Sequence, residues 1–206
     1  MIVEALIENG AAKVPPGTWL CGCGQPAASL GKTALRSLKG FVVPDRAWVR
    51  TAAVEGTAWF ASADAPFLTR IPALPDESLF VVSSKVLVAP AASRVGAKSL
   101  KLVPMSFRRA APVTAFRFGW VVTATRGRVT RVALAEGETL TVRPESLVAW
   151  IGKDPTGFCP RLSVLDIVLP RGPKGLAYSF HGPCVVWFEG AAEAASGRRG
   201  RPWPTR

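Results

Sequence analysis

Two stretches of this sequence, TRIPALPDESLFVVSSKVLVA at residues 69–89 and TRVALAEGETLTVRPESLVA at residues 130–149, match each other and decide the fold. A shift of 61 residues aligns the two copies without a gap from Trp59 to Val81, and a slip of one residue then aligns the following Leu-Val-Ala. Each copy contains an apolar segment, an acidic turn and a hairpin in which apolar and polar residues alternate, as they do on a half-buried strand. We interpret the pair as one duplicated β unit that closes a shared core, because two copies of this length are too few for a solenoid.

The chain on either side of these copies has the same character. Short apolar runs rich in Val, Phe, Trp and Thr, bounded by Gly or Pro, occur at residues 41–43, 79–82, 86–89, 120–123, 129–134 and 184–188. Such runs are typical of β-sandwiches and β-barrels, whereas helix signals are weak throughout. The sequence therefore predicts an all-β fold with two structural repeats of about 61 residues.

We divide the chain into three parts on this basis. Residues 1–40 match neither copy and are expected to form an N-terminal extension. The duplicated β domain is expected at 41–190, and residues 191–206 form a basic tail. Within the domain we place repeats at approximately 41–104 and 105–166 and a closing hairpin at 176–190.

Three short motifs resemble a known family. The motif GETLTV at 137–142, followed by LVAW at 147–150, resembles the signature of the altered-inheritance-of-mitochondria family, and GPCVVWF at 182–188 resembles that family's closing strand. The resemblance covers roughly residues 41–190, with Cys184 where the family prefers Gly. It implies a duplicated double-stranded β-helix, similar to the fold of the tryptophan RNA-binding attenuation protein. It carries over no catalytic residues, and the yeast-type members are linked to the organisation of the mitochondrial inner membrane.

The chain is strongly basic. Its 206 residues include 26 Lys and Arg against 14 Asp and Glu, a net charge of +12, and such a balance attracts polyanions. No acidic residue occurs between Ser78 and Ala135. The candidate anion-binding residues that we select from this stretch are Arg108, Arg109, Arg117, Arg126 and Arg128.

Aromatic residues interleave with these arginines and have two interpretations. Exposed rings could stack on nucleic-acid bases, whereas apolar rings at strand spacing more often belong to the core. The core interpretation is favoured for the aromatic side chains of Phe107, Phe116, Phe118 and Trp120.

The C-terminal residues 196–206, SGRRGRPWPTR, contain four arginines. Arg198, Arg199 and Arg201 join the candidate anion-binding residues for this reason. RGRP at 199–202 resembles the core of an AT-hook, in which an extended Arg-Gly-Arg-Pro enters the minor groove of DNA. A generic basic arm that docks on RNA, DNA or a partner chain is the favoured interpretation of the tail.

Residues for metal binding and catalysis are scarce. The chain has one histidine, His181, and the Cys21–Cys23 pair lacks the second pair that a zinc site needs. We therefore expect free thiols, no metal and no cofactor. Glu77 and Glu138 occupy equivalent turns of the two copies, where they can accept hydrogen bonds from turn N–H groups or pair with Arg70 and Arg131. The sequence assigns no catalytic residue and predicts that the protein is not an enzyme.

These observations predict a non-enzymatic β-rich interaction or scaffold protein. Its basic face and Arg-rich tail would bind an anionic macromolecule, RNA or DNA rather than lipid, within a nucleic-acid-containing or other large assembly. Protein partners or a homo-oligomer are expected, and no apolar run is long enough for a transmembrane segment. The alternative is a membrane-organising scaffold that acts through protein and anionic-lipid contacts. We expect a cytoplasmic protein in a prokaryote and a mitochondrial protein in a eukaryote.

Overall fold

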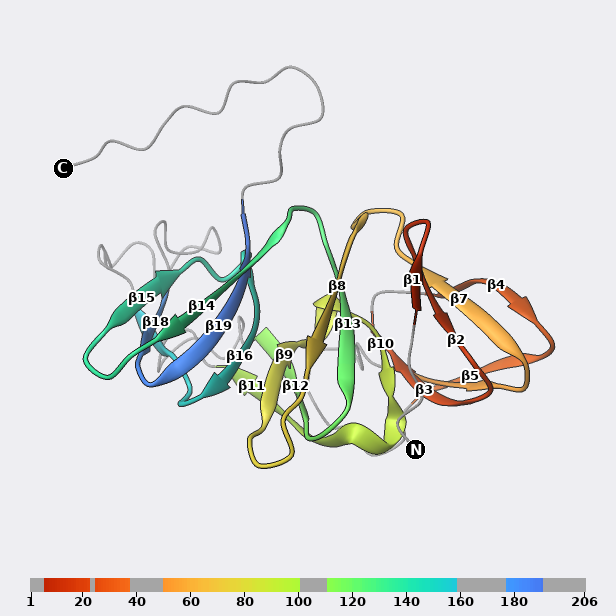
Figure 1. Ribbon diagram of the computed structural model, residues 1–206, viewed down its shortest axis with the longest axis horizontal. Helices are drawn as coiled ribbons and strands as arrows, with labels where there is room; N and C mark the ends of the chain where they lie inside the picture. Colours follow the sequence, from red (N-terminus) through yellow and green to blue (C-terminus); the bar gives the residue numbers. More distant parts are fainter. Residues whose placement is uncertain (1–5, 23–24, 38–49, 101–110, 159–176, 191–206) are drawn as a thin grey trace, which may run out of the picture.

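The computed structural model describes residues 6–22, 25–37, 50–100, 111–158 and 177–190. The regular structure of these residues consists of 19 strands and two short 3₁₀ turns, so the predicted all-β fold is confirmed (Figure 1). In the described ranges no helix has the length and apolar character needed to cross a membrane.

The strands fall into three consecutive groups of six, preceded by a short β1 (Leu6–Glu8). The first group contains β2 (Ala11–Val14), β3 (Gly17–Cys21), β4 (Gln25–Leu30), β5 (Thr33–Ser37), β6 (Arg50–Val54) and β7 (Thr57–Ala61). The second contains β8 (Phe67–Pro72), β9 (Leu79–Val82), β10 (Val86–Pro90), β11 (Arg94–Leu100), β12 (Ala111–Phe116) and β13 (Trp120–Thr125). The third contains β14 (Val129–Leu134), β15 (Thr139–Val142), β16 (Leu147–Gly152), β17 (Thr156–Phe158), β18 (Ala177–His181) and β19 (Cys184–Glu189). The 3₁₀ turns, Ser83–Lys85 and Ala91–Ser93, flank β10.

Strand pairing is the same in each group, which makes each group one structural repeat. The sixth strand pairs with the first and the third, and the fifth strand pairs with the second and the fourth, always antiparallel. Each third strand also carries a register shift at the equivalent residue, Ala27, Leu87 or Val148. A repeat is therefore two half-sheets, one of strands first-sixth-third and one of strands fourth-fifth-second.

Neighbouring repeats are joined through one further pairing. The second strand of each repeat pairs with the third strand of the next, as β3 with β10 and β9 with β16. Half-sheets thereby merge into two six-stranded sheets, β5-β6-β3-β10-β13-β8 and β11-β12-β9-β16-β19-β14. The smaller sheets β1-β2-β7-β4 and β15-β18-β17 lie at the two ends, and Figure 1 shows the repeats following one another along the long axis of the molecule.

This pairing divides the chain differently from the sequence-based scheme. There are three repeats, at 11–61, 67–125 and 129–189, where two were predicted at 41–104 and 105–166. Strands β2 to β5 lie within the predicted N-terminal extension of residues 1–40, but they pair with β6 and β7 and belong to the first repeat. The predicted closing hairpin at 176–190 is wrong, because its two strands, β18 and β19, lie in different sheets and pair with other strands of the third repeat rather than with each other. The basic tail at 191–206 is outside the described residues.

The 61-residue shift aligns equivalent strands only where their amino-acid sequences are still similar. It takes β8 onto β14, so that Arg70 and Arg131 occupy the same position, and it takes β9 onto β15. Apart from Trp59 in β7, the shift does not detect the first repeat, whose strands contain smaller residues, such as QPAASL in β4 against VLVAP in β10. Backbone hydrogen bonds define a strand pair whatever its side chains, so a repeat can persist in structure after its sequence has diverged.

Three clusters of buried side chains form the core. Trp19, Phe60 and Trp120 belong to the first cluster, and Ile71 and Val121 belong to the second. Adjacent residues of β13 thus point into different clusters, because the six-stranded sheets are covered on both faces. A strand in that position loses the usual alternation of buried and exposed residues, and all six residues of β13 are buried.

Candidate functional site

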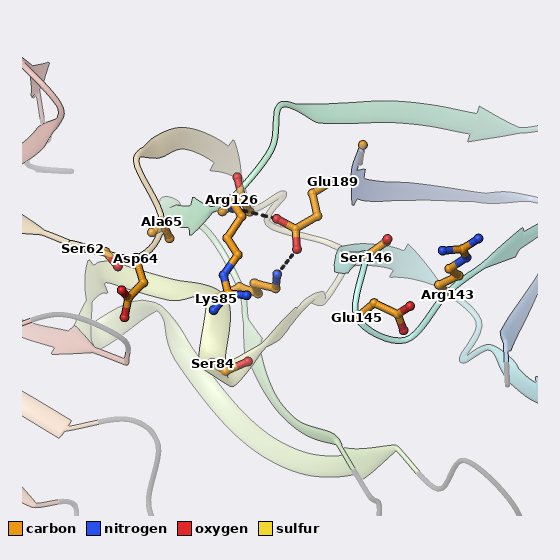
Figure 2. A pocket seen from close by; sticks show the side chains of 13 residues that line it. Ser62, Asp64, Ala65, Ser84, Lys85, Arg126, Arg143, Glu145, Ser146 and Glu189 are labelled. Atoms are coloured by element: carbon orange, nitrogen blue, oxygen red, sulfur yellow. Dashed lines mark hydrogen bonds and ion pairs between the residues drawn. The ribbon is translucent and has the colours of Figure 1, made fainter. Parts of the chain in front are cut away.

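An open cleft of about 550 Å³ lies where the sixth strands of all three repeats end (Figure 2). Its walls come from the chain after β7, the end of β13, the end of β19, the 3₁₀ turn after β9 and the β15–β16 turn. The cleft is lined by Ser62, Asp64, Ala65, Ser84, Lys85, Ala124, Thr125, Arg126, Arg143, Glu145, Ser146, Glu189 and Gly190. Stacking of the repeats assembles the cleft, because Ser62, Arg126 and Gly190 directly follow the first, second and third repeats.

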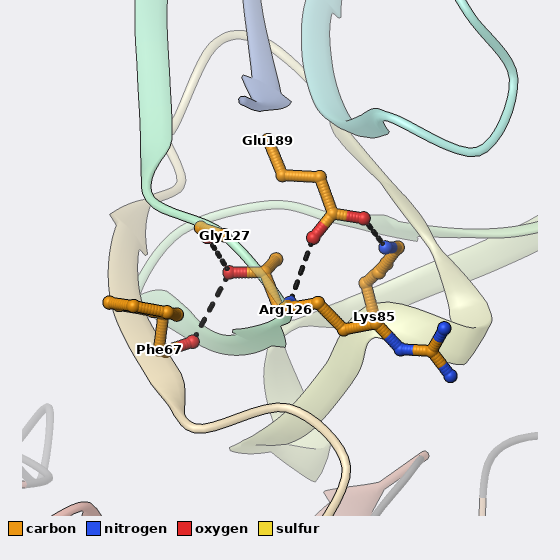
Figure 3. Close-up of polar contacts among 6 residues, drawn as sticks. Phe67, Lys85, Arg126, Gly127 and Glu189 are labelled. Atoms are coloured by element: carbon orange, nitrogen blue, oxygen red, sulfur yellow. Dashed lines mark hydrogen bonds and ion pairs between the residues drawn. The ribbon is translucent and has the colours of Figure 1, made fainter. Parts of the chain in front are cut away.

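Glu189 stabilises one side of the cleft through an ion pair and a hydrogen bond (Figure 3). One of its carboxylate oxygens forms an ion pair with Nζ of Lys85, and the other accepts a hydrogen bond of 2.9 Å from the backbone N–H of Arg126. The side chains of Lys85 and Glu189 are only 18% and 11% exposed. Because Lys85 lies in the second repeat, Arg126 directly follows that repeat and Glu189 lies in the third, this carboxylate links two repeats.

Replacing Glu189 by Gln should lower the free energy of unfolding by about 1–3 kcal/mol, because the largely buried Lys85 ammonium loses its counter-charge. The amide oxygen of Gln can still accept the Arg126 hydrogen bond, so the variant isolates the charge. Urea unfolding of the variant and of the parent protein measures the difference.

The matched control is Glu8→Gln. Glu8 and Lys13 form a second ion pair, at 4.0 Å, with side chains 49% and 38% exposed. An exposed pair of this kind contributes about 0–1 kcal/mol. Equal losses in the two variants would contradict the linking role of Glu189.

The cleft lining carries both signs of charge. Figure 2 draws Arg126 and Lys85 near the middle of the cleft, Asp64 on one side, and Arg143 with Glu145 on the other. Three serines add hydroxyl groups, and the lining contains neither His nor Cys. Guanidinium and hydroxyl groups in a half-open cleft suit the recognition of a phosphate or carboxylate group.

Three of the eight predicted anion-binding arginines are described, and the structure does not gather them into one patch. Arg117, Arg126 and Arg128 are all exposed. Arg117 precedes β13 and Arg126 follows it, so a six-residue strand of roughly 20 Å separates them. Arg126 and Arg128 lie together in the β13–β14 turn beside the cleft. The other predicted residues, Arg108, Arg109, Arg198, Arg199 and Arg201, are outside the described residues.

Acidic residues from other parts of the chain lie beside the stretch at 79–134 in the folded protein, although the stretch itself contains none. Glu189 pairs with Lys85, and Asp154 pairs with Lys98, so acids from beyond the stretch neutralise two of its lysines. Nζ of Lys98 also lies 3.4 Å from the ring centre of Phe80. The ion pairs of the described ranges include none formed by the guanidinium groups of Arg117, Arg126 or Arg128.

A cation from the first strand lies over a tryptophan of the sixth strand in every repeat. The distances to the ring centres are 5.8 Å for Lys13 over Trp59, 5.6 Å for Arg70 over Trp120 and 5.9 Å for Arg131 over Trp187. Such contacts contribute about 0.5–1 kcal/mol at exposed sites. These three cations are therefore part of the repeat, whereas the cations of the β13–β14 turn have no such partner among the described rings.

The aromatic side chains mostly support the core interpretation. Phe116 and Trp120 are fully buried, while Phe118 is 44% exposed. Phe107 is outside the described residues. Two backbone hydrogen bonds, Ala73 N–H to Gly119 O and Arg117 N–H to Ser93 O, draw three turns together around Phe118. The exposed side chains of these turns include the apolar Leu74, Val95 and Phe118 and the charged Asp76, Glu77 and Arg117.

The remaining candidates are structural or isolated. A carboxylate oxygen of Glu138 accepts a 2.7 Å hydrogen bond from the backbone N–H of Ala135, as expected for a turn carboxylate. Cys21 and Cys184 are buried, and burial raises the pKa of the Cys184 thiol. His181 is exposed and contacts only the hydroxyls of Thr139 and Ser179 among the hydrogen bonds of the described residues. Within those residues no cluster of three or more His, Cys, Asp or Glu could hold a metal ion.

The sequence analysis did not select Asp64, Lys85, Arg143 or Glu189 as site residues. They come together only because segments of three repeats, namely the chain after β7, the turns after β9 and β15, and the end of β19, meet beside the end of β13. A signal for this arrangement was available in the sequence. Glycines between the fifth and sixth strands occur at 56, 119 and 182, a constant spacing of 63 residues.

Comparison with known proteins gives a structural likeness. No family model matches the chain, and no curated protein matches it. Among solved structures, the crystal structure of protein SPYM3_0169 from Streptococcus pyogenes superposes with a TM-score of 0.68 at 14% sequence identity. The match covers 92% of this chain and 93% of that chain, so the two share an all-β fold over almost their whole length.

Proposed function

We propose that this chain is a non-enzymatic β-repeat module that binds an anionic macromolecule, with RNA or DNA as the leading candidate, as a subunit of a larger assembly. The observation that carries the proposal is the distribution of charge between the sheets and the segments that connect them. Counterion release makes such binding strong at low salt and largely independent of sequence.

The described residues are close to charge balance. They contain 14 Lys and Arg against 10 Asp and Glu, an excess of four. The other segments contain 12 against 4, an excess of eight, so two thirds of the net charge of +12 lies there. Three of these segments, 38–49, 101–110 and 159–176, connect the fourth and fifth strands of successive repeats. The same connection is therefore basic in all three repeats, and the tail at 191–206 adds four more arginines.

The cleft adds exposed positive charge within the described part of the chain. The guanidinium group of Arg126 lines it, and Arg128 is exposed two residues away. Neither has an ion-pair partner among the described residues, whereas Lys85 is neutralised by Glu189. Arginines of this kind can contact phosphates without first breaking an internal pair.

The test is a salt titration of binding to a fluorescent single-stranded RNA and to a duplex DNA, followed by anisotropy. The parent protein should bind both, with log K falling, for each tenfold rise in salt, by about 0.9 per phosphate contact on the duplex DNA and about 0.7 on the single-stranded RNA. The double variant Arg126→Gln/Arg128→Gln should flatten that slope by about two contacts and weaken binding roughly tenfold at low salt.

The control is Lys32→Gln/Lys153→Gln, which removes two charges from exposed positions away from the cleft. Its salt slope should equal that of the parent. No binding at low salt, or equal losses in the two double variants, would overturn the assignment of nucleic-acid binding to this turn.

A second candidate function is a membrane-organising scaffold, as the family resemblance implies. It is favoured by the exposed corner of the second repeat, where Leu74, Val95 and Phe118 are 44–49% exposed beside Arg117. An apolar tip next to a cation can enter an anionic lipid surface. Flotation with phosphatidylserine vesicles separates the two candidates, because binding to vesicles without binding to nucleic acid would select the scaffold.

A further inference from the structure

The two ends of the stack are complementary halves of one sheet. Each internal six-stranded sheet joins the fourth-fifth-second half-sheet of one repeat to the third-sixth-first half-sheet of the next. The terminal sheet β15-β18-β17 is a half-sheet of the former kind, and β1-β2-β7-β4 contains one of the latter kind. In the described part of the chain, β15 and β4 therefore each have one edge that no strand pairs.

The side chains of β4 are more exposed than those of the equivalent strands β10 and β16, as expected if β4 lacks a strand partner on one edge. In the other repeats the third strand is buried except for its last residue, as the burial of β10 and β16 shows. In β4 the residues from Ala27 to Leu30 are all exposed, and Leu30, at 67%, is the most exposed large apolar side chain of the described residues. The side chains equivalent to Ala27 and Ala28 are fully buried in both other repeats, as Leu87, Val88, Val148 and Ala149.

The exposure of β15 has the same explanation. Its counterpart β9, which pairs with the next repeat, is buried at three of four residues, whereas β15 is buried only at Val142. Leu140 is partly exposed although it packs against the third core cluster. The third cluster thus ends at an uncovered strand, while the first and second are covered by the repeat that follows.

We propose that a second copy of this chain docks here, with β4 of one copy pairing antiparallel to β15 of another. The union would reproduce the six-stranded sheet that already occurs twice within the chain. The hydrophobic core would then extend from one copy into the next, as it already extends from one repeat into the next. This self-association is independent of anion binding.

The internal sheets fix the register of this pairing. In the β9–β16 pair, Leu79, Phe80 and Val81 lie opposite Ile151, Trp150 and Ala149. The 61-residue shift takes Leu79 to Leu140, and Ala28 corresponds to Ala149 because each pairs with a tryptophan of its sixth strand. The expected cross-copy pairs are therefore Leu140 with Leu30, Thr141 with Ser29, and Val142 with Ala28.

The register shift in β4 does not block this pairing. An irregularity at an edge strand often prevents unwanted strand addition. Here the same shift occurs in β10 and β16, and both of those strands pair with the preceding repeat. The contact is head-to-tail, so it generates a ring if the rotation closes and a filament if it does not.

The first experiment is sedimentation velocity on nuclease-treated protein over a wide range of concentration. The parent should form species heavier than the 21.9 kDa chain, in proportions that rise with concentration. Leu30→Glu should reduce the mass to that of a single chain. The control Leu35→Glu, at an exposed leucine of β5, should behave as the parent. A parent that is a single chain throughout, or a control that dissociates equally, would overturn the proposal.

The second experiment does not depend on the folding of the charged variant. Ser29→Cys and Thr141→Cys proteins are prepared separately, mixed and mildly oxidised, with the parent and its native cysteines as background. The mixture should give a disulfide-linked dimer of one variant with the other, well above the yield of either variant alone. A Ser29→Cys protein that cross-links to itself as efficiently would show a symmetric contact and refute the head-to-tail arrangement.

Discussion

Replacing Trp120 by Ala should lower the free energy of unfolding by about 3–5 kcal/mol, a large share of the 5–15 kcal/mol of an ordinary domain. Trp120 is 1% exposed, belongs to the first core cluster, and stacks on Trp19 with ring centres 5.6 Å apart. It lies in the second repeat but packs against the first, so the cavity would open at the junction of two repeats. Urea unfolding at a fixed pH measures the loss through the midpoint and slope.

Two further variants make this expectation specific. Trp120→Phe keeps an aromatic ring in the site and should lose less than Trp120→Ala. Phe118→Ala removes a ring that is 44% exposed only two residues away, and its effect should remain below about 1.5 kcal/mol. A loss for Trp120→Ala no larger than that of Phe118→Ala would contradict the packing described for the first core cluster.

The second large effect is expected at Gly56, in the turn between β6 and β7. A Cβ atom at this position would lie 1.8 Å from the carbonyl oxygen of Leu30 and 2.9 Å from its carbonyl carbon. Both are backbone atoms, so the clash cannot be relieved by a rotamer change. Gly56→Ala should destabilise the protein by about 2–4 kcal/mol, as measured by thermal or urea unfolding.

Gly96→Ala is the matched control for this substitution. A Cβ atom at Gly96 would meet no heavy atom within 4 Å. Its effect should be neutral or stabilising by about 0.4–1 kcal/mol, because Ala restricts the unfolded chain more than Gly does. The two variants make the same chemical change, but only Gly56→Ala is expected to destabilise the protein. Equal destabilisation by both would rule out the close approach at Gly56.

Much of the fold could be predicted from the sequence because strand signals are local. Val-rich runs bounded by Gly and Pro predicted strands at Leu79–Val82, Val129–Leu134 and Cys184–Phe188, where β9, β14 and β19 lie. The number of repeats could not be predicted from the same signal. The first repeat pairs its strands as the others do, but its third strand, QPAASL, lacks the large apolar residues of β10 and β16.

The candidate site was less predictable than the fold. The sequence selected Arg126 and Arg128 from a stretch without acidic residues. It could not reveal that Glu189, 104 residues further along the chain, would neutralise Lys85 of that stretch. Charge along a chain is local, whereas ion pairs form between whichever side chains the sheets bring together.

The sequence by itself determined the all-β class and the excess of positive charge in particular segments. Both follow from the composition and order of short stretches. Only the tertiary structure decided how the three repeats pair and stack, that three sixth strands end at one polar cleft, and that β4 and β15 are left as complementary edges. The physical reason is that sheet pairing depends on backbone hydrogen bonds between strands far apart in the chain, which side-chain patterns record only where the strands have not diverged.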